Sequence, residues 1–189
     1  QQLDQQWEQL FNLKATHIGM LHSVEGMDRF SVVKDKCAAL VCNSDYLAQC
    51  VIKQWGKSAI VALPVPGTAC IAKKKHNKAV YHTFFNPVKS KGSELMAQLI
   101  LGNPDRFFMV VLGWDLKMEW ELDVKTQKNV MVIPPQQQVD EIYSFSKMVL
   151  IPSQEPEAFG RVQFEAAMNN IPCCVSNQGG LKNYYSDNG

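Results

Sequence analysis

Two glutamates separated by seven residues, Glu157 and Glu165, are the side chains in this sequence best placed to do chemistry. The apolar run at residues 148–151 predicts a buried strand, so Glu157 follows in a polar loop and Glu165 lies in the helix predicted over residues 161–169. Apolar residues flank Glu165 on its helical face, which is an unusual place for a solvated acid. Because carboxylates accept hydrogen bonds from hydroxyls, two of them facing one pocket could bind a polyhydroxyl ligand.

Three further residues could serve an anionic ligand or move a proton. Gly160 stands at the predicted helix start, where backbone N–H groups and the helix dipole favour phosphate. Lys91 precedes a second predicted helix and could donate a charge-assisted hydrogen bond to phosphate. His22 ends the apolar run at residues 17–21 and could exchange a proton near neutral pH.

Each of these residues also has an ordinary structural explanation. Glu157 is equally consistent with a surface loop acid, and Glu165 with a partly buried helix acid that has a local partner. Lys91 fits an exposed lysine before a helix, and His22 fits a turn cap. Spacing alone leaves these alternatives open.

Alternating strands and helices must position these residues. Short apolar runs predict strands at residues 17–21, 38–42, 59–65, 80–84, 107–112, 130–133, 148–151 and 173–175. Helices are predicted at residues 3–11, 30–37, 45–55, 93–101, 139–145 and 161–169, with Ser44 as an N-cap and Gly56 as a stop signal. This order predicts an α/β fold with a doubly wound, Rossmann-like parallel sheet, in which ligands bind beyond the carboxyl ends of the strands.

A break in the pattern predicts two domains. Pro64, Pro66 and Gly67 interrupt the apolar runs, and a lysine-rich stretch follows at residues 73–78. We therefore expect residues 1–66 to close one Rossmann-like domain and residues 67–189 to form a second.

Composition excludes several classes of function. The net charge is +1 over 189 residues, which argues against nucleic acid as a partner. No apolar run approaches the roughly 20 residues that span a bilayer, so we expect no membrane span, although peripheral association stays open. The six cysteines include no Cys-x-x-Cys pair, so we expect no metal site, and together with the polar N-terminus they predict a cytoplasmic protein.

The order of features around Glu157 resembles the donor-site signature of the family 4 retaining glycosyltransferases, which have the GT-B fold. The matching residues are Ser153, Glu157-Ala158-Phe159-Gly160-Arg161, Glu165, Ile171-Pro172 and Gly179-Gly180. The resemblance implies that Glu157 contacts hydroxyls of the transferred sugar and that Glu165 binds the ribose of the nucleotide. It also implies donor contacts for Ala158, Phe159, Gly160 and Arg161.

Weaker matches extend the resemblance upstream. Lys91-Gly92 is similar to the family's diphosphate-binding Lys-Gly, whereas Asn86 replaces the arginine that commonly accompanies it. Gly113 and Ile133 resemble backbone positions that flank the donor nucleotide. His22 is similar to the cleft histidine of the acceptor domain, which makes His22, Lys91 and Glu157 the catalytic candidates.

The resemblance implies an incomplete GT-B enzyme, with the end of the acceptor-side domain and most of the donor domain but not its last elements. The implied reaction is transfer, with retention, of a hexose-type sugar from a nucleoside diphosphate sugar to a hydroxyl of a carbohydrate, lipid or protein. No cofactor besides this donor substrate is implied.

Two other functions were weighed against this one. A nicotinamide-dependent oxidoreductase would need Gly-x-Gly-x-x-Gly after a first strand, and that motif is absent from the sequence. A non-catalytic module that binds nucleotide sugars or a partner is favoured by Asn86 and by Asn183, which stands where the family usually has an acid.

Overall fold

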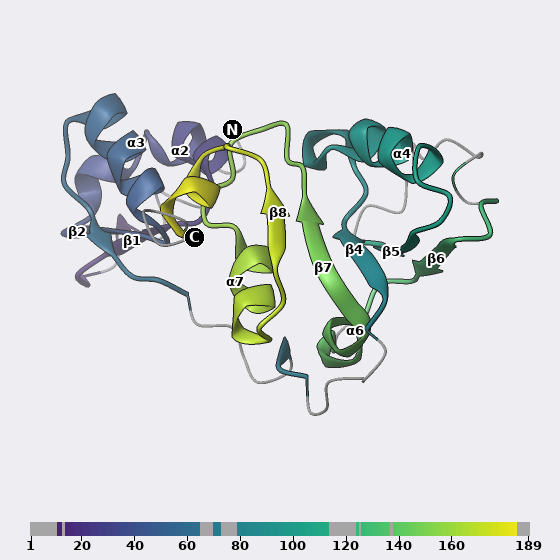
Figure 1. Ribbon diagram of the computed structural model, residues 1–189. Coiled ribbons are helices and arrows are strands. Elements are labelled where there is room, and N and C mark those ends of the chain that lie inside the picture. The colour runs from purple at the N-terminus through teal and green to yellow at the C-terminus, as the bar shows by residue number, and fades with distance from the viewer. Residues whose placement is uncertain are drawn as a thin grey trace.

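Two parallel sheets follow one another along the chain in the computed structural model, which describes residues 11–12, 14–64, 70–72, 79–113, 124, 126–136 and 138–184. The first sheet has the order β1-β2-β3, with strands β1 (Ile18–Leu21), β2 (Ala39–Cys42) and β3 (Ile60–Val61). The second has the order β6-β5-β4-β7-β8, with strands β4 (Tyr81–Phe85), β5 (Phe107–Val111), β6 (Val130–Ile133), β7 (Ser146–Ile151) and β8 (Cys173–Val175). Figure 1 shows the first sheet at the left of the molecule and the second extending from the middle, at β8 and β7, to β6 at the right.

Helices alternate with these strands. They are α2 (Val24–Phe30), α3 (Asp45–Trp55), α4 (Ser93–Leu101), α6 (Asp140–Phe145) and α7 (Arg161–Met168). Short 3₁₀ turns are η1 (Lys34–Lys36), η3 (Lys89–Lys91) and η4 (Gly180–Tyr184). Every strand pair of the described sheets is parallel, which confirms the predicted doubly wound α/β fold.

Successive residues of the second sheet pack on opposite faces. Phe108 and Val110 share a core cluster with residues of α4, whereas Met109 and Val111 pack with Ile142 of α6. Residues of α7 join β7 and β8 in a further cluster that contains Tyr143. Helices therefore cover both faces of this sheet, as a parallel sheet requires.

Two predicted elements need correction. The helix expected over residues 30–37 is wrong, because the chain instead forms α2 and then η1. Ser23 is the N-cap of α2, because its Oγ accepts a hydrogen bond of 3.0 Å from Gly26 N. The helix therefore begins six residues before the predicted start. The strand expected over residues 59–65 is wrong in length: only Ile60–Val61 pair, and Pro64, which has no N–H, follows shortly after.

The remaining predicted elements that the structure describes agree with it to within one or two residues at each end. The N-cap and the stop signal are also confirmed. Leu47 N donates to Ser44 Oγ at 3.1 Å, and Gly56 takes the left-handed conformation, with φ at 64°. The helix expected over residues 3–11 lies almost wholly outside the described residues.

The two sheets meet through α3. Ser44 is 2% exposed, and its Oγ donates a hydrogen bond to the carbonyl oxygen of Ala158. The Ala158 side chain packs against the core of the first sheet. The same helix contacts η4. The expected domain boundary at residues 66 and 67 lies outside the described residues and stays a prediction.

Replacing Ser44 with alanine should lower the free energy of unfolding by about 2–4 kcal/mol. The variant loses an N-cap, about 1 kcal/mol, and removes the donor to the partly buried Ala158 carbonyl, about 1–3 kcal/mol. Urea unfolding measures the change. Ser23→Ala is the matched control, because Ser23 caps the exposed start of α2, and it should cost only about 1 kcal/mol. Equal losses in the two variants would contradict a role for the bond between the sheets.

Candidate functional site

A pocket with a volume of about 770 Å³ opens at the carboxyl ends of β4, β5 and β7. Its lining comprises Phe84, Phe85, Asn86, Lys91, Val111, Leu112, Gly113, Pro135, Gln136, Val139, Leu150, Ile151, Ser153, Glu157, Gly160, Arg161, Val162 and Glu165. Both its position and its volume are typical of the ligand sites of parallel α/β sheets.

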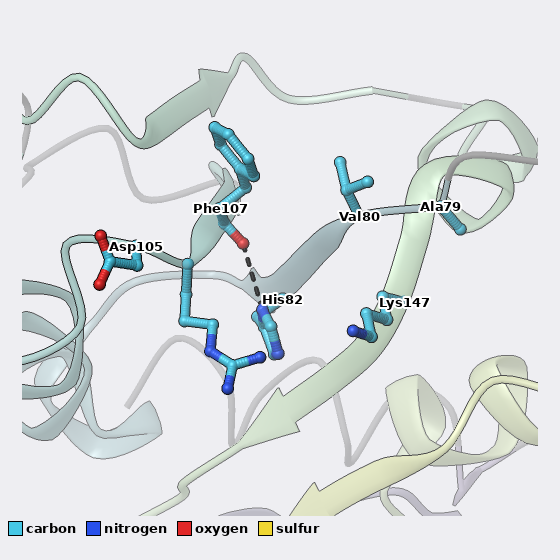
Figure 2. Close-up of a pocket in the computed structure, with 7 residues that line it drawn as sticks. Ala79, Val80, His82, Asp105, Phe107 and Lys147 are labelled. Carbon is cyan, nitrogen blue, oxygen red and sulfur yellow. Dashed lines mark hydrogen bonds between the residues drawn. The ribbon is translucent and has the colours of Figure 1, made fainter.

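A smaller pocket of about 190 Å³ lies at the opposite edge of the same sheet. Figure 2 shows it between the first residues of β4, β5 and β7. His82 Nδ1 lies 3.3 Å from Phe107 O. The Lys147 side chain extends toward His82, and that of Asp105 is directed away from it. It is below the usual size of a small-molecule site, roughly 300–1,000 Å³. The pocket at the carboxyl ends is therefore the candidate site.

Glu157 is held at one side of the larger pocket by two donors. Ser153 Oγ donates to Glu157 Oε1 at 2.6 Å, and Lys91 Nζ forms an ion pair with the same oxygen. The Glu157 side chain is 18% exposed, so part of its carboxylate remains open to a ligand. The structure thus brings together two predicted residues that lie on different loops.

Two glycines fix the backbone of the Glu157 loop. Gly180 N donates to Glu157 O at 2.6 Å, and Gly179 forms a bridge with Glu157. A Cβ at Gly179 would lie 2.4 Å from Glu157 O, and a Cβ at Gly180 would lie 2.4 Å from Ala158 O. Only glycine permits so close an approach of the two segments.

The loop that carries Lys91 is fixed in a similar way. Gly92 has φ at 86°, and a Cβ there would lie 2.2 Å from Pro152 O. Gln154 N donates to Ser90 O at 2.8 Å. The loops after β4 and β7 are therefore in direct contact, and this contact sets Lys91 beside Glu157.

Glu165 lies at the base of the pocket and is 5% exposed. Tyr143 Oη donates to Glu165 Oε2 at 2.7 Å, and Arg161 Nε donates to Glu165 Oε1 at 2.5 Å. Burial, and then the Glu165 carboxylate, raise the pKa of Tyr143 far above its usual value, so its hydroxyl stays a donor. The hydrogen bond from Arg161 to Glu165 raises the pKa of the guanidinium, which stays charged.

Three other predicted residues line the pocket. Asn86 has a positive φ of 54°, a conformation in which asparagine is enriched and longer side chains are uncommon. Gly113 lies directly against the Asn86 side chain: a Cβ at Gly113 would be 2.2 Å from Asn86 Oδ1. Gly160 has φ at 82° and begins α7 at the pocket wall.

Four predicted residues do not belong to the described lining. Ile133 packs against the core beside β5, and Phe159 is 5% exposed with its ring 5.7 Å from that of Phe164. Ala158 turns toward α3, and His22 is an exposed residue after β1 whose carbonyl accepts from Asn43 Nδ2 at 3.1 Å. The roles expected for these four residues stay predictions.

Sequence reasoning missed several residues that shape the site. Tyr143 gave no signal, because an aromatic residue in an apolar helix is typical of a core. Pro135 and Gln136 line the pocket directly after β6, and their position past a strand end was a usable signal.

The described residues include neither a metal-binding cluster nor a membrane-spanning helix. No group of three or more His, Cys, Asp or Glu side chains in the described ranges is arranged to hold a metal ion. No helix among those ranges is long and apolar enough to cross a membrane.

Comparison with known proteins gives consistent results. The family model described as glycosyl transferases group 1 matches residues 88–189. A comparison with curated proteins finds no match.

Similar solved structures include HepE of Anabaena in complex with UDP and glucose, at 14% identity and a TM-score of 0.76, covering 92% of this chain and 56% of HepE. TarM of S. aureus, in complex with UDP among other ligands, matches at 13% and 0.76, covering 97% and 42%. WaaG, a glycosyltransferase of lipopolysaccharide biosynthesis, matches at 12% and 0.70, covering 97% and 65%. The chain thus spans about half the length of these structures.

Proposed function

Because this chain belongs to the family of glycosyl transferases group 1, we propose that it holds the donor site of an enzyme that moves a sugar from a nucleoside diphosphate sugar to a hydroxyl acceptor. One observation carries the proposal: Lys91 with Glu157, and Arg161 with Glu165, line a single pocket of about 770 Å³ at the carboxyl ends of a parallel sheet. Two carboxylates suit the hydroxyls of two sugar rings, and cations suit the diphosphate between them.

Each pocket residue has a role in this proposal. Glu157 accepts hydrogen bonds from hydroxyls of the transferred sugar, and Glu165 accepts them from the ribose. Lys91 and the backbone N–H groups at the start of α7 stabilise the negative charge that grows on the leaving diphosphate. Gly113 and the backbone after Ile133 flank the nucleotide.

The reaction is a substitution at the anomeric carbon. The bond from that carbon to the β-phosphate oxygen breaks, the acceptor oxygen forms the new bond, and the acceptor proton passes to the leaving phosphate. Retention of configuration, a hexose as the sugar, and a carbohydrate, lipid or protein as the acceptor all extend this proposal through the resemblance around Glu157. His22 belongs to it as a cleft residue of the acceptor side. A cytoplasmic location is supported by six cysteines that are not joined in disulfides.

A second candidate function is binding without turnover. It is favoured by Asn86, a neutral residue in the pocket, and by the ion pair that occupies Lys91. Release of UDP from a UDP-hexose over time separates the two functions, because a binding module holds the donor without cleaving it.

The test of the donor site is calorimetric titration of the 189-residue chain with UDP, GDP and ADP, and then with their hexose conjugates. UDP is the first probe, because both HepE and TarM were solved with it. We expect saturable binding of one diphosphate nucleotide per chain. A chain that is folded by circular dichroism yet binds none of the three would contradict the proposal.

A further inference from the structure

Both cations of the described pocket lining are already paired with carboxylates. Lys91 contacts Glu157, and Arg161 contacts Glu165, so the four charges of this lining sum to zero. A diphosphate brings negative charge into this pocket. Its contact with either cation is strongest when that cation turns away from its present carboxylate.

The two ion pairs differ in exposure. The Arg161 side chain is 71% exposed while that of Glu165 is 6% exposed, so the arginine lies on the solvent side of the buried acid. The other carboxylate oxygen, Glu165 Oε2, accepts a hydrogen bond from Tyr143 Oη, which lies in the core. A ligand hydroxyl that is to reach Glu165 Oε1 therefore competes with Arg161 for that oxygen.

We propose that Arg161 is a mobile cation that leaves Glu165 for the diphosphate when a nucleotide enters; this inference rests on the proposed function. Arg161 is the first residue of α7, beside the Gly160 backbone at the pocket wall, and its long, exposed side chain is free to take other rotamers. It contacts Glu165 through Nε, so the terminal amino groups of the guanidinium can serve as further donors.

The exchange conserves strong contacts on both sides. Arg161 gives up one charge-assisted hydrogen bond to a carboxylate and gains another to a phosphate. Glu165 loses Arg161 and gains the ribose hydroxyls, while Tyr143 keeps the carboxylate in place. Asn86 is neutral, so the described lining has two positive charges, those of Lys91 and Arg161.

This exchange makes the pocket selective for phosphorylated nucleotides. A nucleoside without phosphates offers nothing to draw Arg161 away, so Arg161 competes with its ribose for Glu165. A nucleoside diphosphate offers Arg161 a phosphate contact in place of the contact with Glu165. Arg161 therefore raises the affinity for UDP and lowers the affinity for uridine.

The experiment compares UDP and uridine on the full chain. Calorimetry measures UDP binding, and ligand-observed NMR measures uridine binding, for the unchanged chain, Arg161→Gln and Arg161→Lys. We expect Arg161→Gln to lower UDP affinity and to leave uridine affinity equal or raised. The ratio of UDP affinity to uridine affinity should fall by about 10-fold or more, because only the diphosphate offers Arg161 a charge-assisted hydrogen bond in exchange for Glu165. Arg161→Lys should keep most of the UDP affinity.

Lys89→Gln is the matched control, because Lys89 is an exposed cation that pairs with Glu94 outside the described pocket lining. Unchanged UDP affinity in Arg161→Gln would overturn the inference and leave the proposed function standing. Equal losses for UDP and uridine would also overturn it, since Arg161 would then serve only to orient Glu165. Absence of UDP binding by the folded, unchanged chain would contradict the proposed function itself.

Discussion

Replacement of Glu165 with alanine should lower UDP affinity by about 30-fold or more. The carboxylate is the proposed acceptor for the ribose hydroxyls, and loss of two charge-assisted hydrogen bonds costs about 2 kcal/mol or more. The substitution also leaves Tyr143 Oη unpaired inside the core. Calorimetric titration with UDP measures the loss of affinity.

Two controls separate binding from folding. Glu141→Ala removes an exposed acid on α6 that does not belong to the described pocket lining, and it should leave UDP affinity unchanged. Glu165→Gln keeps an acceptor for Tyr143 and most of the shape of the side chain. It should therefore fold with little change in unfolding temperature yet bind UDP weakly. Full UDP affinity in both Glu165 variants would show that the nucleotide binds elsewhere.

Replacement of Lys91 with methionine should slow donor cleavage by about 100-fold to 1,000-fold. Lys91 is the cation beside Glu157, and preorganised groups that stabilise a leaving oxyanion contribute about 2.7–4 kcal/mol to the barrier. The measured quantity is the rate of UDP release from a saturating UDP-hexose. Because methionine keeps the aliphatic stem, the change reports on charge rather than on packing.

Lys89→Met serves as the control for Lys91→Met, since it removes a neighbouring cation that is 73% exposed. That variant should retain the rate of the unchanged chain. A Lys91→Met rate within about threefold of the unchanged chain would assign the charge stabilisation to other groups, among them Arg161 and the backbone at Gly160.

Local signals were enough to predict most of the fold. The apolar runs that became β4, β5, β6, β7 and β8 are short and continuous, as expected of strands covered on both faces. Ser44 and Gly56 marked the ends of α3 correctly, because capping depends on residues within one turn. The same reasoning failed at α2, because the helix expected over residues 30–37 left out the N-cap signal of Ser23.

The site was predictable where one segment carries it and not where distant segments meet. Glu157, Gly160 and Glu165 lie within a single strand-loop-helix unit, so their common pocket followed from the order of elements. The pairing of Lys91 with Glu157 depends on contact between the loops after β4 and β7, which no local pattern encodes. Tyr143 reaches Glu165 only because α6 and α7 pack on one face of the sheet.

The hydrogen bond from Ser44 to Ala158 has a thermodynamic consequence for the two halves of the molecule. Ala158 is the neighbour of Glu157, so α3 of the first sheet is attached to the backbone of the loop that carries a proposed sugar contact. In the proposed function, a tilt of the first sheet that breaks this bond would release the backbone beside Glu157 and so change the affinity for the donor. Linkage requires the reverse as well: a bound donor biases the tilt by the same free energy. The bond from Ser44, the packing of Ala158 and the contact of α3 with η4 are thus the routes by which this linkage would act.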